Sequence, residues 1–194
     1  VMLMLKPVDV LLVGVGGQGT ILASKILCAA AISIGYDLKM SEIHGMAQRG
    51  GSVVTQVRLG EKVNSPMVEK GCAEVILAFE QLEGLRWLPY LKKGGTMIVN
   101  KQTISPVPVL AGLAEYPANV LEYIEQKVPG AVLLNALGKA IECGNAKAAN
   151  VVLLGALASR LPIPLANWEK ALEETVPPKF LEVNQKAFKA GYDS

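Results

Sequence analysis

The first part of the chain alternates short apolar runs with glycine-rich turns. Residues 9–15 form a continuous apolar run, which predicts a central parallel strand buried on both faces. Residues 18–34 are apolar on almost every side and predict a buried helix that Gly35 ends. A second strand over residues 36–43 completes a strand–helix–strand unit, for which a right-handed crossover is expected.

The next strand is expected to run against its neighbour. Residues 52–59 alternate between an apolar face and a face that carries Gln56 and Arg58, which predicts a half-exposed strand. Only residues 44–51 connect it to the preceding strand, whereas a parallel crossover needs about a dozen residues or more. The sequence therefore predicts an antiparallel pair, and with it a mixed sheet within an α/β fold.

The remaining segments follow the same α/β pattern and become helical toward the C-terminus. Strands are expected at 73–79, at 96–100 after a Gly94-Gly95 turn, and at 131–134, and helices at 81–91, 118–127 and 137–142. The proline-containing segment 101–117 predicts irregular chain with at most a short strand. Helices are also expected at 148–161, from an N-cap at Asn167 to Val176, and at 179–190, closed by Gly191.

The composition describes a compact protein with little catalytic equipment. Of 194 residues, 51% are hydrophobic and 19% are charged, which excludes a disordered chain and fits one domain. The net charge is +2 with Lys and Arg spread along the chain, so no nucleic-acid partner is expected. No apolar stretch reaches about 18 residues and the N-terminus lacks a signal-peptide pattern, which indicates a cytoplasmic protein without a membrane partner.

Few residues are available for metal binding or covalent catalysis. Cys28, Cys72 and Cys143 are far apart without a C-x-x-C motif, so they are expected to be buried small hydrophobes. His44 is the only histidine, which excludes a multi-histidine metal site. Ser41 and Ser52 lie near His44 in the sequence but form no recognised triad motif. No catalytic or metal-ligating residue is predicted.

A glycine motif marks the first strand–helix junction. Gly14, Gly16 and Gly19 satisfy G-x-G-x-x-G, and Glu42 ends the second strand 23 residues after Gly19, as in dinucleotide-binding proteins. The motif therefore predicts either phosphate binding at the helix N-terminus or a tight turn with close helix packing. The candidate cofactor-binding residues are Gly14, Gly16, Gly17, Gln18 and Gly19.

A second glycine-rich loop carries polar side chains without hydrophobic periodicity, which is typical of a binding element. Its sequence around residues 44–51 is H-G-M-A-Q-R-G-G. The alternative is structural, with His44 bonded to the backbone and Arg49 paired with Glu42. The candidate interface or active-site residues are Glu42, His44, Gly45, Met46, Gln48, Arg49, Gly50, Gly51 and Ser52.

Taken together, G-V-G-G-Q-G at 14–19 and E-I-H-G-M-A-Q-R-G-G-S-V at 42–53 resemble the gamma domain of 2-oxoacid:ferredoxin oxidoreductases. The H-G-M-A-Q-R-G-G-S-V form is most similar to the small (beta) subunits of the indolepyruvate branch. Residues 145–150 and 184–191 also resemble that family, so the resemblance extends over essentially the whole chain.

The resemblance implies a three-layer α/β/α fold with a mixed, mostly parallel Rossmann-like sheet and a helical C-terminal third, in a single gamma-type domain over residues 1–194. It also implies a heteromeric enzyme that oxidatively decarboxylates a 2-oxoacid with coenzyme A and reduces ferredoxin. Thiamine diphosphate and iron–sulfur clusters are then expected on a large partner subunit, with no cofactor held tightly by this chain. The open alternatives are a stand-alone NAD(P)- or nucleotide-binding protein and a module that senses nucleotide or coenzyme A.

Overall fold

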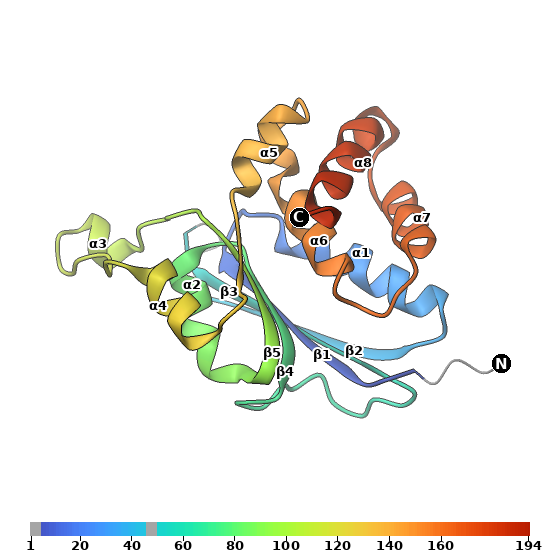
Figure 1. Cartoon of the computed structure of the whole chain (residues 1–194), viewed down its shortest axis with the longest axis horizontal. Helices are drawn as coiled ribbons and strands as arrows, with labels where there is room; N and C mark the ends of the chain where they lie inside the picture. The colour runs from blue at the N-terminus through green and yellow to red at the C-terminus, as the bar shows by residue number, and fades with distance from the viewer. Residues whose placement is uncertain (1–4, 46–49) are drawn as a thin grey trace.

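A computed structural model describes residues 5–45 and 50–194 of the chain. Within these residues a six-stranded sheet has the order β2-β3-β1-β4-β5-β6 (Figure 1). All of its strands run in the same direction except β3, which is antiparallel to both neighbours. The strands are β1 (Val8–Val15), β2 (Asp37–His44), β3 (Ser52–Gly60), β4 (Ala73–Ala78), β5 (Leu91–Asn100) and β6 (Val132–Leu134).

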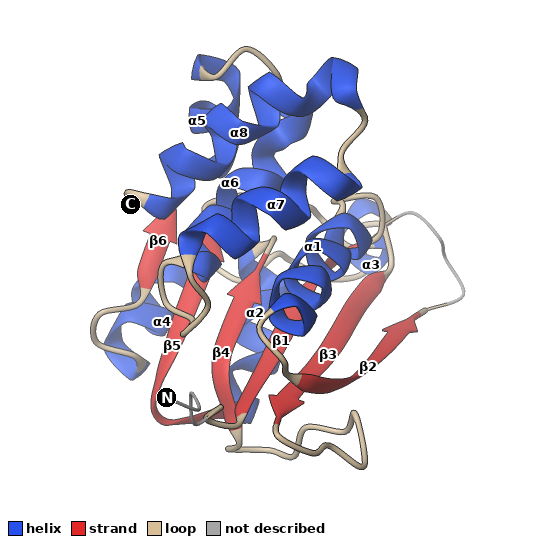
Figure 2. Cartoon of the chain, turned by 90° about the vertical axis from the view of Figure 1, so that its right-hand side faces the viewer, coloured by secondary structure: helices blue, strands red, loops and turns tan. Residues whose placement is uncertain are grey.

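Helices cover both faces of the sheet (Figures 1 and 2). One hydrophobic core lies between the sheet and α1, α5, α6, α7 and α8, and a second lies between the sheet and α2 and α4. The three-layer α/β/α prediction with a mixed, mostly parallel sheet is therefore confirmed. The helices are α1 (Thr20–Ser33), α2 (Gln81–Trp87), α3 (Val107–Leu110), α4 (Val120–Lys127), α5 (Ala136–Glu142), α6 (Ala149–Ala158), α7 (Leu165–Thr175) and α8 (Pro178–Tyr192), with the short 3-10 helices η1 (Leu88–Tyr90) and η2 (Ala146–Ala148).

Strand β3 runs antiparallel as predicted, but the expectation that it is half-exposed was wrong. It lies between β1 and β2, and every residue except Ser52 and Arg58 is buried. The segment after β3 covers the polar face, because Gln56 Oε1 accepts a 2.7 Å hydrogen bond from the Val68 backbone N–H. Arg58 pairs with Asp9 at 2.9 Å on the same face. The edge strand on this side of the sheet is therefore β2, and β3 is an interior strand.

Two expectations from the local sequence were wrong in the middle of the chain. Gly94 and Gly95 lie inside β5, which begins at Leu91, and not in a turn before the strand. Gly94 has a φ of +77°, and the register between β5 and β4 shifts in this part of the strand. The segment 101–117, expected to be irregular, contains the short helix α3. Gly35, with a φ of +95°, follows α1 as predicted.

Two predicted ends of the C-terminal helices were also wrong. Asn167 is not an N-cap, because α7 begins two residues earlier, after Pro164. The Asn167 side chain instead donates from Nδ2 to Ser33 Oγ at 2.8 Å. Gly191 does not end the last helix, since α8 continues to Tyr192.

Gly191 serves to bring two helix backbones together. A Cβ atom added at Gly191 would overlap the carbonyl oxygen of Val152 in α6. A Cβ atom added at Gly155 in α6 would likewise overlap the carbonyl oxygen of Phe188 in α8. The two glycines thus form a reciprocal contact that fixes α8 against the buried helix α6.

We expect Gly191→Ala to destabilise the fold. The added methyl group meets rigid backbone, so the free energy of unfolding should fall by about 2–3 kcal/mol and the melting temperature by about 5–10 °C. Thermal unfolding followed by circular dichroism measures this. Gly45→Ala, where no atom of the described residues lies within 4 Å of the added Cβ, is the matched control and should unfold near the wild-type temperature. Equal melting temperatures for both variants would contradict the close packing.

Candidate functional site

Different structural constraints require glycine at different positions between β1 and α1. A Cβ at Gly14 would lie 2.9 Å from the Cβ of Phe79, and a Cβ at Gly19 would overlap the side-chain amide of Asn150. Gly19 also has a φ of +81°, which favours glycine. Gly17 has a φ of +98°, and no atom of residues 5–45 or 50–194 lies within 4 Å of its missing Cβ. Packing therefore accounts for Gly14 and Gly19, whereas the left-handed backbone conformation accounts for Gly17.

The side chain of Gln18 joins the carboxyl ends of the central strands. Its Oε1 accepts from the Val15 backbone N–H at 2.7 Å, and its Nε2 donates to the Phe79 carbonyl at 2.9 Å and to Gln102 Oε1 at 3.1 Å. Asn100 donates to the same carbonyl and to Gln102, at 3.0 and 3.1 Å. The amide of Gln18 is thus occupied by structural bonds, and this predicted cofactor-binding residue positions the loop.

The position of Glu42 differs from that of the acidic residue in dinucleotide-binding folds. There the second strand adjoins the first, so its terminal carboxylate reaches the ribose. Here β3 separates β2 from β1, and Glu42 lies opposite Thr55 on β3. With neighbouring strands about 4.8 Å apart, Glu42 lies about 10 Å from β1. The geometry therefore disfavours NAD binding, although both sequence requirements are met.

A pocket of about 200 Å³ lies beside the glycine loop, where β1, β4 and β5 end. Its lining includes Gly17, Gln18, Gln102, Lys147 and Asn150. The Oδ1 atom of Asn150 is buried and has no hydrogen-bond partner among the described residues, while its Nδ2 donates to the Gly19 carbonyl at 3.3 Å. The pocket is smaller than the roughly 300–1,000 Å³ typical of cofactor sites, so it can hold a small group but not a whole cofactor.

The second glycine-rich loop lies against the first. The Gly16 N–H donates to the Gly51 carbonyl at 2.9 Å, and the Gly45 N–H donates to the Ser52 carbonyl at 3.3 Å. His44, which ends β2, is exposed. Of the other predicted loop residues, Met46, Gln48 and Arg49 lie outside the described residues, so the pairing of Arg49 with Glu42 stays a prediction. The described parts place the two predicted sites on one surface.

Helix α2 contributes two buried glutamates that sequence reasoning missed. Ser52 Oγ donates to Glu83 Oε2 at 2.6 Å, and Arg86 Nη1 donates to Glu83 Oε1 at 2.9 Å. Burial raises the pKa of the Glu83 carboxyl, against the opposing effects of Ser52 and Arg86. Glu80 caps α2 by accepting from the Glu83 N–H at 2.9 Å. Their position directly after a buried parallel strand was the available signal, because functional side chains gather at such ends.

The cysteines differ in part from the prediction. All three thiols are free, but Cys72 is exposed, while Cys28 and Cys143 are partly buried. Burial raises the pKa of Cys28 to about 11, so this thiol stays protonated at neutral pH.

Within residues 5–45 and 50–194, His, Cys, Asp and Glu form no group that could hold a metal ion. None of the helices in these ranges is both long and apolar enough to span a membrane.

Comparison with known proteins assigns the chain to a family. Residues 9–194 match the family model described as pyruvate ferredoxin/flavodoxin oxidoreductase. The chain belongs to this family. An indolepyruvate oxidoreductase subunit IorB from Pyrococcus horikoshii is 43% identical over 192 residues, which cover 96% of this chain and 95% of that protein.

Solved structures of this oxidoreductase family share the fold. The gamma subunit of a keto/oxoacid ferredoxin oxidoreductase from Geobacter sulfurreducens aligns with a TM-score of 0.71 and 27% identity, covering 96% of each chain. The 2-oxoglutarate:ferredoxin oxidoreductase from Magnetococcus marinus aligns with a TM-score of 0.72 and 19% identity. The alignment covers 97% of this chain but 31% of that one, so there the fold forms part of a longer polypeptide.

We expect Gln18→Met to loosen the glycine loop. Methionine is similar in length but leaves the Val15 N–H without its acceptor, which should lower the free energy of unfolding by about 2 kcal/mol. Thermal unfolding measures the loss, and amide hydrogen exchange should show faster exchange at Val15. Gln126→Met, on the exposed side of α4, is the control and should leave both quantities unchanged. Wild-type exchange at Val15 in Gln18→Met would contradict the assigned role.

Proposed function

We propose that this chain is the small subunit of a heteromeric 2-oxoacid:ferredoxin oxidoreductase whose substrate is indolepyruvate or a related aryl pyruvate. Such an enzyme converts the 2-oxoacid and coenzyme A into an acyl-CoA and carbon dioxide, and the released electrons reduce ferredoxin. The name of the Pyrococcus horikoshii relative, at 43% identity over nearly the full length of both chains, supports this substrate class.

The proposed complex divides the chemistry between its subunits. Thiamine diphosphate and the iron–sulfur clusters belong to the larger partner subunit, and ferredoxin interacts with the complex as a whole. Residues 1–194 form a single gamma-type domain that works in the cytoplasm, with neither nucleic acid nor membrane as a partner. Its contribution is a surface that completes the active site of the larger subunit.

The observation that carries this proposal is the junction of the two glycine-rich loops. The hydrogen bond from Gly16 to Gly51 joins them at the carboxyl edge of the sheet, and Ser52 is fixed to α2 through Glu83. Ligands of open α/β sheets bind at this edge. The loop residues 42–52, including Arg49 and His44, are the proposed contact with the larger subunit.

Within this surface, the pocket beside Gly17 is proposed to receive a phosphate group of coenzyme A. The pocket volume of about 200 Å³ fits one such group but not the whole molecule, whose remainder would lie against the larger subunit. Lys147 supplies a positive charge, and the N-terminus of α1 directs its free N–H groups toward an anion. The alternatives are a stand-alone NAD-dependent enzyme and a sensing module for nucleotide or coenzyme A.

The first test compares the isolated chain with the complex. With indolepyruvate, coenzyme A and a ferredoxin-like acceptor, we expect no turnover from the chain alone, and turnover once the co-expressed larger subunit is present. Calorimetric titration of the chain with NAD should show no saturable binding in the micromolar range. Turnover by the chain alone, or micromolar NAD binding that Gly16→Val abolishes, contradicts the proposal. Failure of any larger subunit to associate favours the sensing module.

The second test concerns the coenzyme A phosphate. In the complex, Lys147→Ala should raise the KM for coenzyme A about tenfold, because a charge-assisted hydrogen bond of about 1.4 kcal/mol or more is lost. The KM for the 2-oxoacid and kcat should change little. Lys170→Ala, which removes an exposed lysine of α7, is the matched control. An unchanged KM for coenzyme A in Lys147→Ala removes Lys147 from the proposed site.

A further inference from the structure

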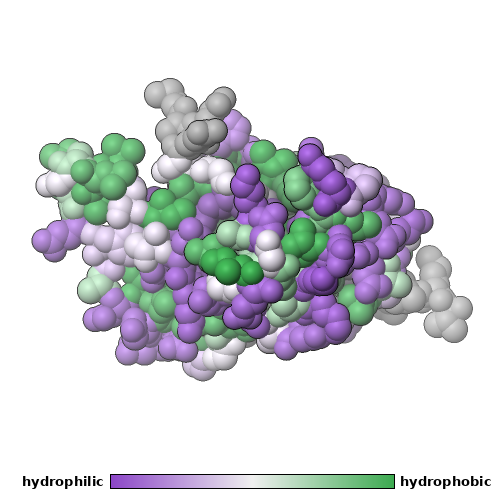
Figure 3. All heavy atoms as spheres, turned by 90° about the horizontal axis from the view of Figure 1, so that it is seen from above, coloured by the Kyte–Doolittle hydropathy of each residue, from purple (hydrophilic) through white to green (hydrophobic). Residues whose placement is uncertain are grey.

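Between β5 and α4 the chain leaves the body of the protein as an arm, residues 103–116, which carries α3 (Figure 1). The side chains of Val107, Leu110 and Leu113 are 65%, 75% and 82% exposed, the highest values for large apolar residues in the described part of the chain. They belong to neither hydrophobic core. Seen from above, the arm forms a projecting apolar knob (Figure 3).

The composition of the arm is unlike that of a solvated loop. No charged residue occurs from Gln102 to Ala114, although Lys101 and Glu115 flank this stretch. Exposed connecting segments are ordinarily polar, whereas grouped exposed apolar side chains mark contact sites. The arm therefore has the chemistry of a surface that is covered in the working protein.

The arm is held in its projecting position by its base. Tyr116 donates its phenolic hydrogen to Glu80 Oε1, and the Ile104 N–H donates to the same atom at 3.2 Å. Glu80 is 1% exposed, and Tyr116 packs against the second core. Burial, together with the hydrogen bond to Glu80, raises the pKa of Tyr116 well above its ordinary value, so the hydroxyl remains a donor. Both ends of the arm are thus anchored on α2.

The tip of the arm is ordered by its own backbone. The Leu113 N–H donates to the Pro108 carbonyl at 2.8 Å, and the Ala111 N–H donates to the Val107 carbonyl at 2.9 Å. These bonds hold the apolar side chains together in one turn-sized unit. A preorganised knob loses less conformational entropy on docking than a flexible segment does.

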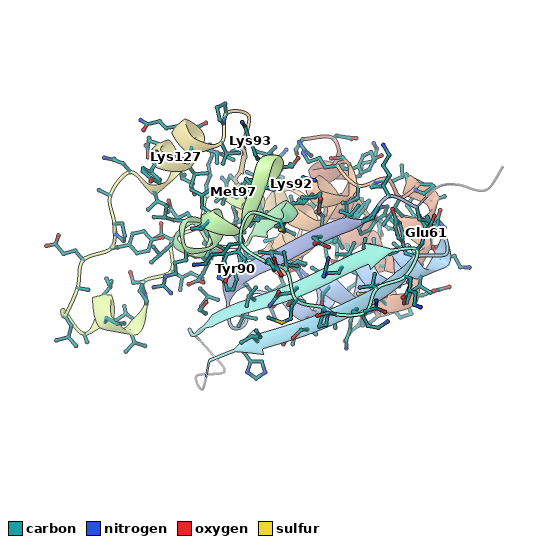
Figure 4. The ribbon with its side chains drawn as sticks, turned by 90° about the horizontal axis from the view of Figure 1, so that it is seen from below. Glu61, Tyr90, Lys92, Lys93, Met97 and Lys127 are labelled. Atoms are coloured by element: carbon teal, nitrogen blue, oxygen red, sulfur yellow. The ribbon has the colours of Figure 1, made fainter. Side chains whose placement is uncertain are left out.

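The same helix anchors the proposed subunit contact. Glu80 holds the arm and Glu83, one turn later, holds Ser52 at the end of loop 42–52. The view from below shows α3 on the side of the molecule where β3 begins (Figure 4). The base of the arm and Ser52 are therefore both held at the N-terminal turn of α2.

The exposed area argues against pairing between two arms. The three tip side chains expose on the order of 400 Å², about half of the roughly 800 Å² that each partner buries in a standard interface. Two arms alone would not hold two copies together. An interface of ordinary size requires a partner that covers the arm together with the surface beside it. The Pyrococcus horikoshii relative is named as a subunit, which indicates that further protein binds that relative.

We infer that the arm docks its apolar tip into an apolar depression on the larger subunit, next to the contact proposed around Ser52. The inference rests on the proposed function for the existence of that subunit. It assigns Leu110 and Leu113 as the side chains that are buried at the centre of the contact with the larger subunit. A few side chains that are fully buried near the centre of an interface typically supply most of its binding free energy.

The test uses the double variant Leu110→Glu/Leu113→Glu of the full chain. Its affinity for the purified larger subunit should fall at least tenfold, because two charges would be buried without partners. The matched control is Ile32→Glu/Ile141→Glu, since these side chains on α1 and α5 are 59% and 58% exposed and lie outside the arm. The control should bind within about twofold of wild type. Both isolated variants should keep the wild-type melting temperature, and the milder Leu110→Ser/Leu113→Ser should weaken binding in the same direction.

Three results would overturn the inference. Wild-type affinity of the arm variants for the larger subunit shows that the tip is not an anchor, while the proposed function stands. A dimer of the isolated chain in analytical ultracentrifugation that the arm variants abolish assigns the tip to a second copy. A wild-type chain that binds no larger subunit contradicts the proposed function, and with it the docking of the arm.

Discussion

The placement of β3 between β1 and β2 determines the geometry of the candidate site. Because β3 is antiparallel, its first residue Ser52 lies at the same edge as the last residues of β1, and the Gly16–Gly51 hydrogen bond becomes possible. The same insertion moves Glu42 one strand further from the glycine loop. A motif that indicates dinucleotide binding in the sequence is thus built into the surface that we propose to contact the larger subunit and a phosphate group.

The sequence could predict the direction of β3 but not its position. The length of the link over residues 44–51 limits strand direction, because a short connection joins only antiparallel strands. It does not say which strand takes the other side of β3. That choice depends on β1, whose residues pair with β3 from Val8 to Val15. For the same reason the alternation over residues 52–59 was misleading, since the polar face is covered by the chain around Val68.

The wrong helix boundaries come from the same limitation at smaller scale. Asn167 has the preferred chemistry of an N-cap, yet its amide bonds Ser33 on a helix far away in sequence. Gly191 has the preferred chemistry of a helix end, yet contact with Val152 requires the absence of a side chain within the helix. Local preferences are worth about 1 kcal/mol each, which tertiary packing readily exceeds. Among the site residues, the glycines and Ser52 were predictable from motifs, whereas Lys147 in η2 and Asn150 in α6 are remote from them in sequence.

The buried glutamates of α2 explain how one face can carry both a rigid loop and a projecting arm. A buried carboxylate without partners is costly, so Glu80 and Glu83 require donors in fixed places. Within α2 the donors are Arg86 and the Glu83 N–H. Outside it they are Tyr116 and the backbone of Ile104 on the arm, and Ser52 on the loop. Each carboxylate therefore fixes a segment that has little core of its own. Burying these carboxyl groups is costly, but their hydrogen bonds are directional and fix the arm and the loop in defined positions. An apolar contact of similar size would define these positions less sharply.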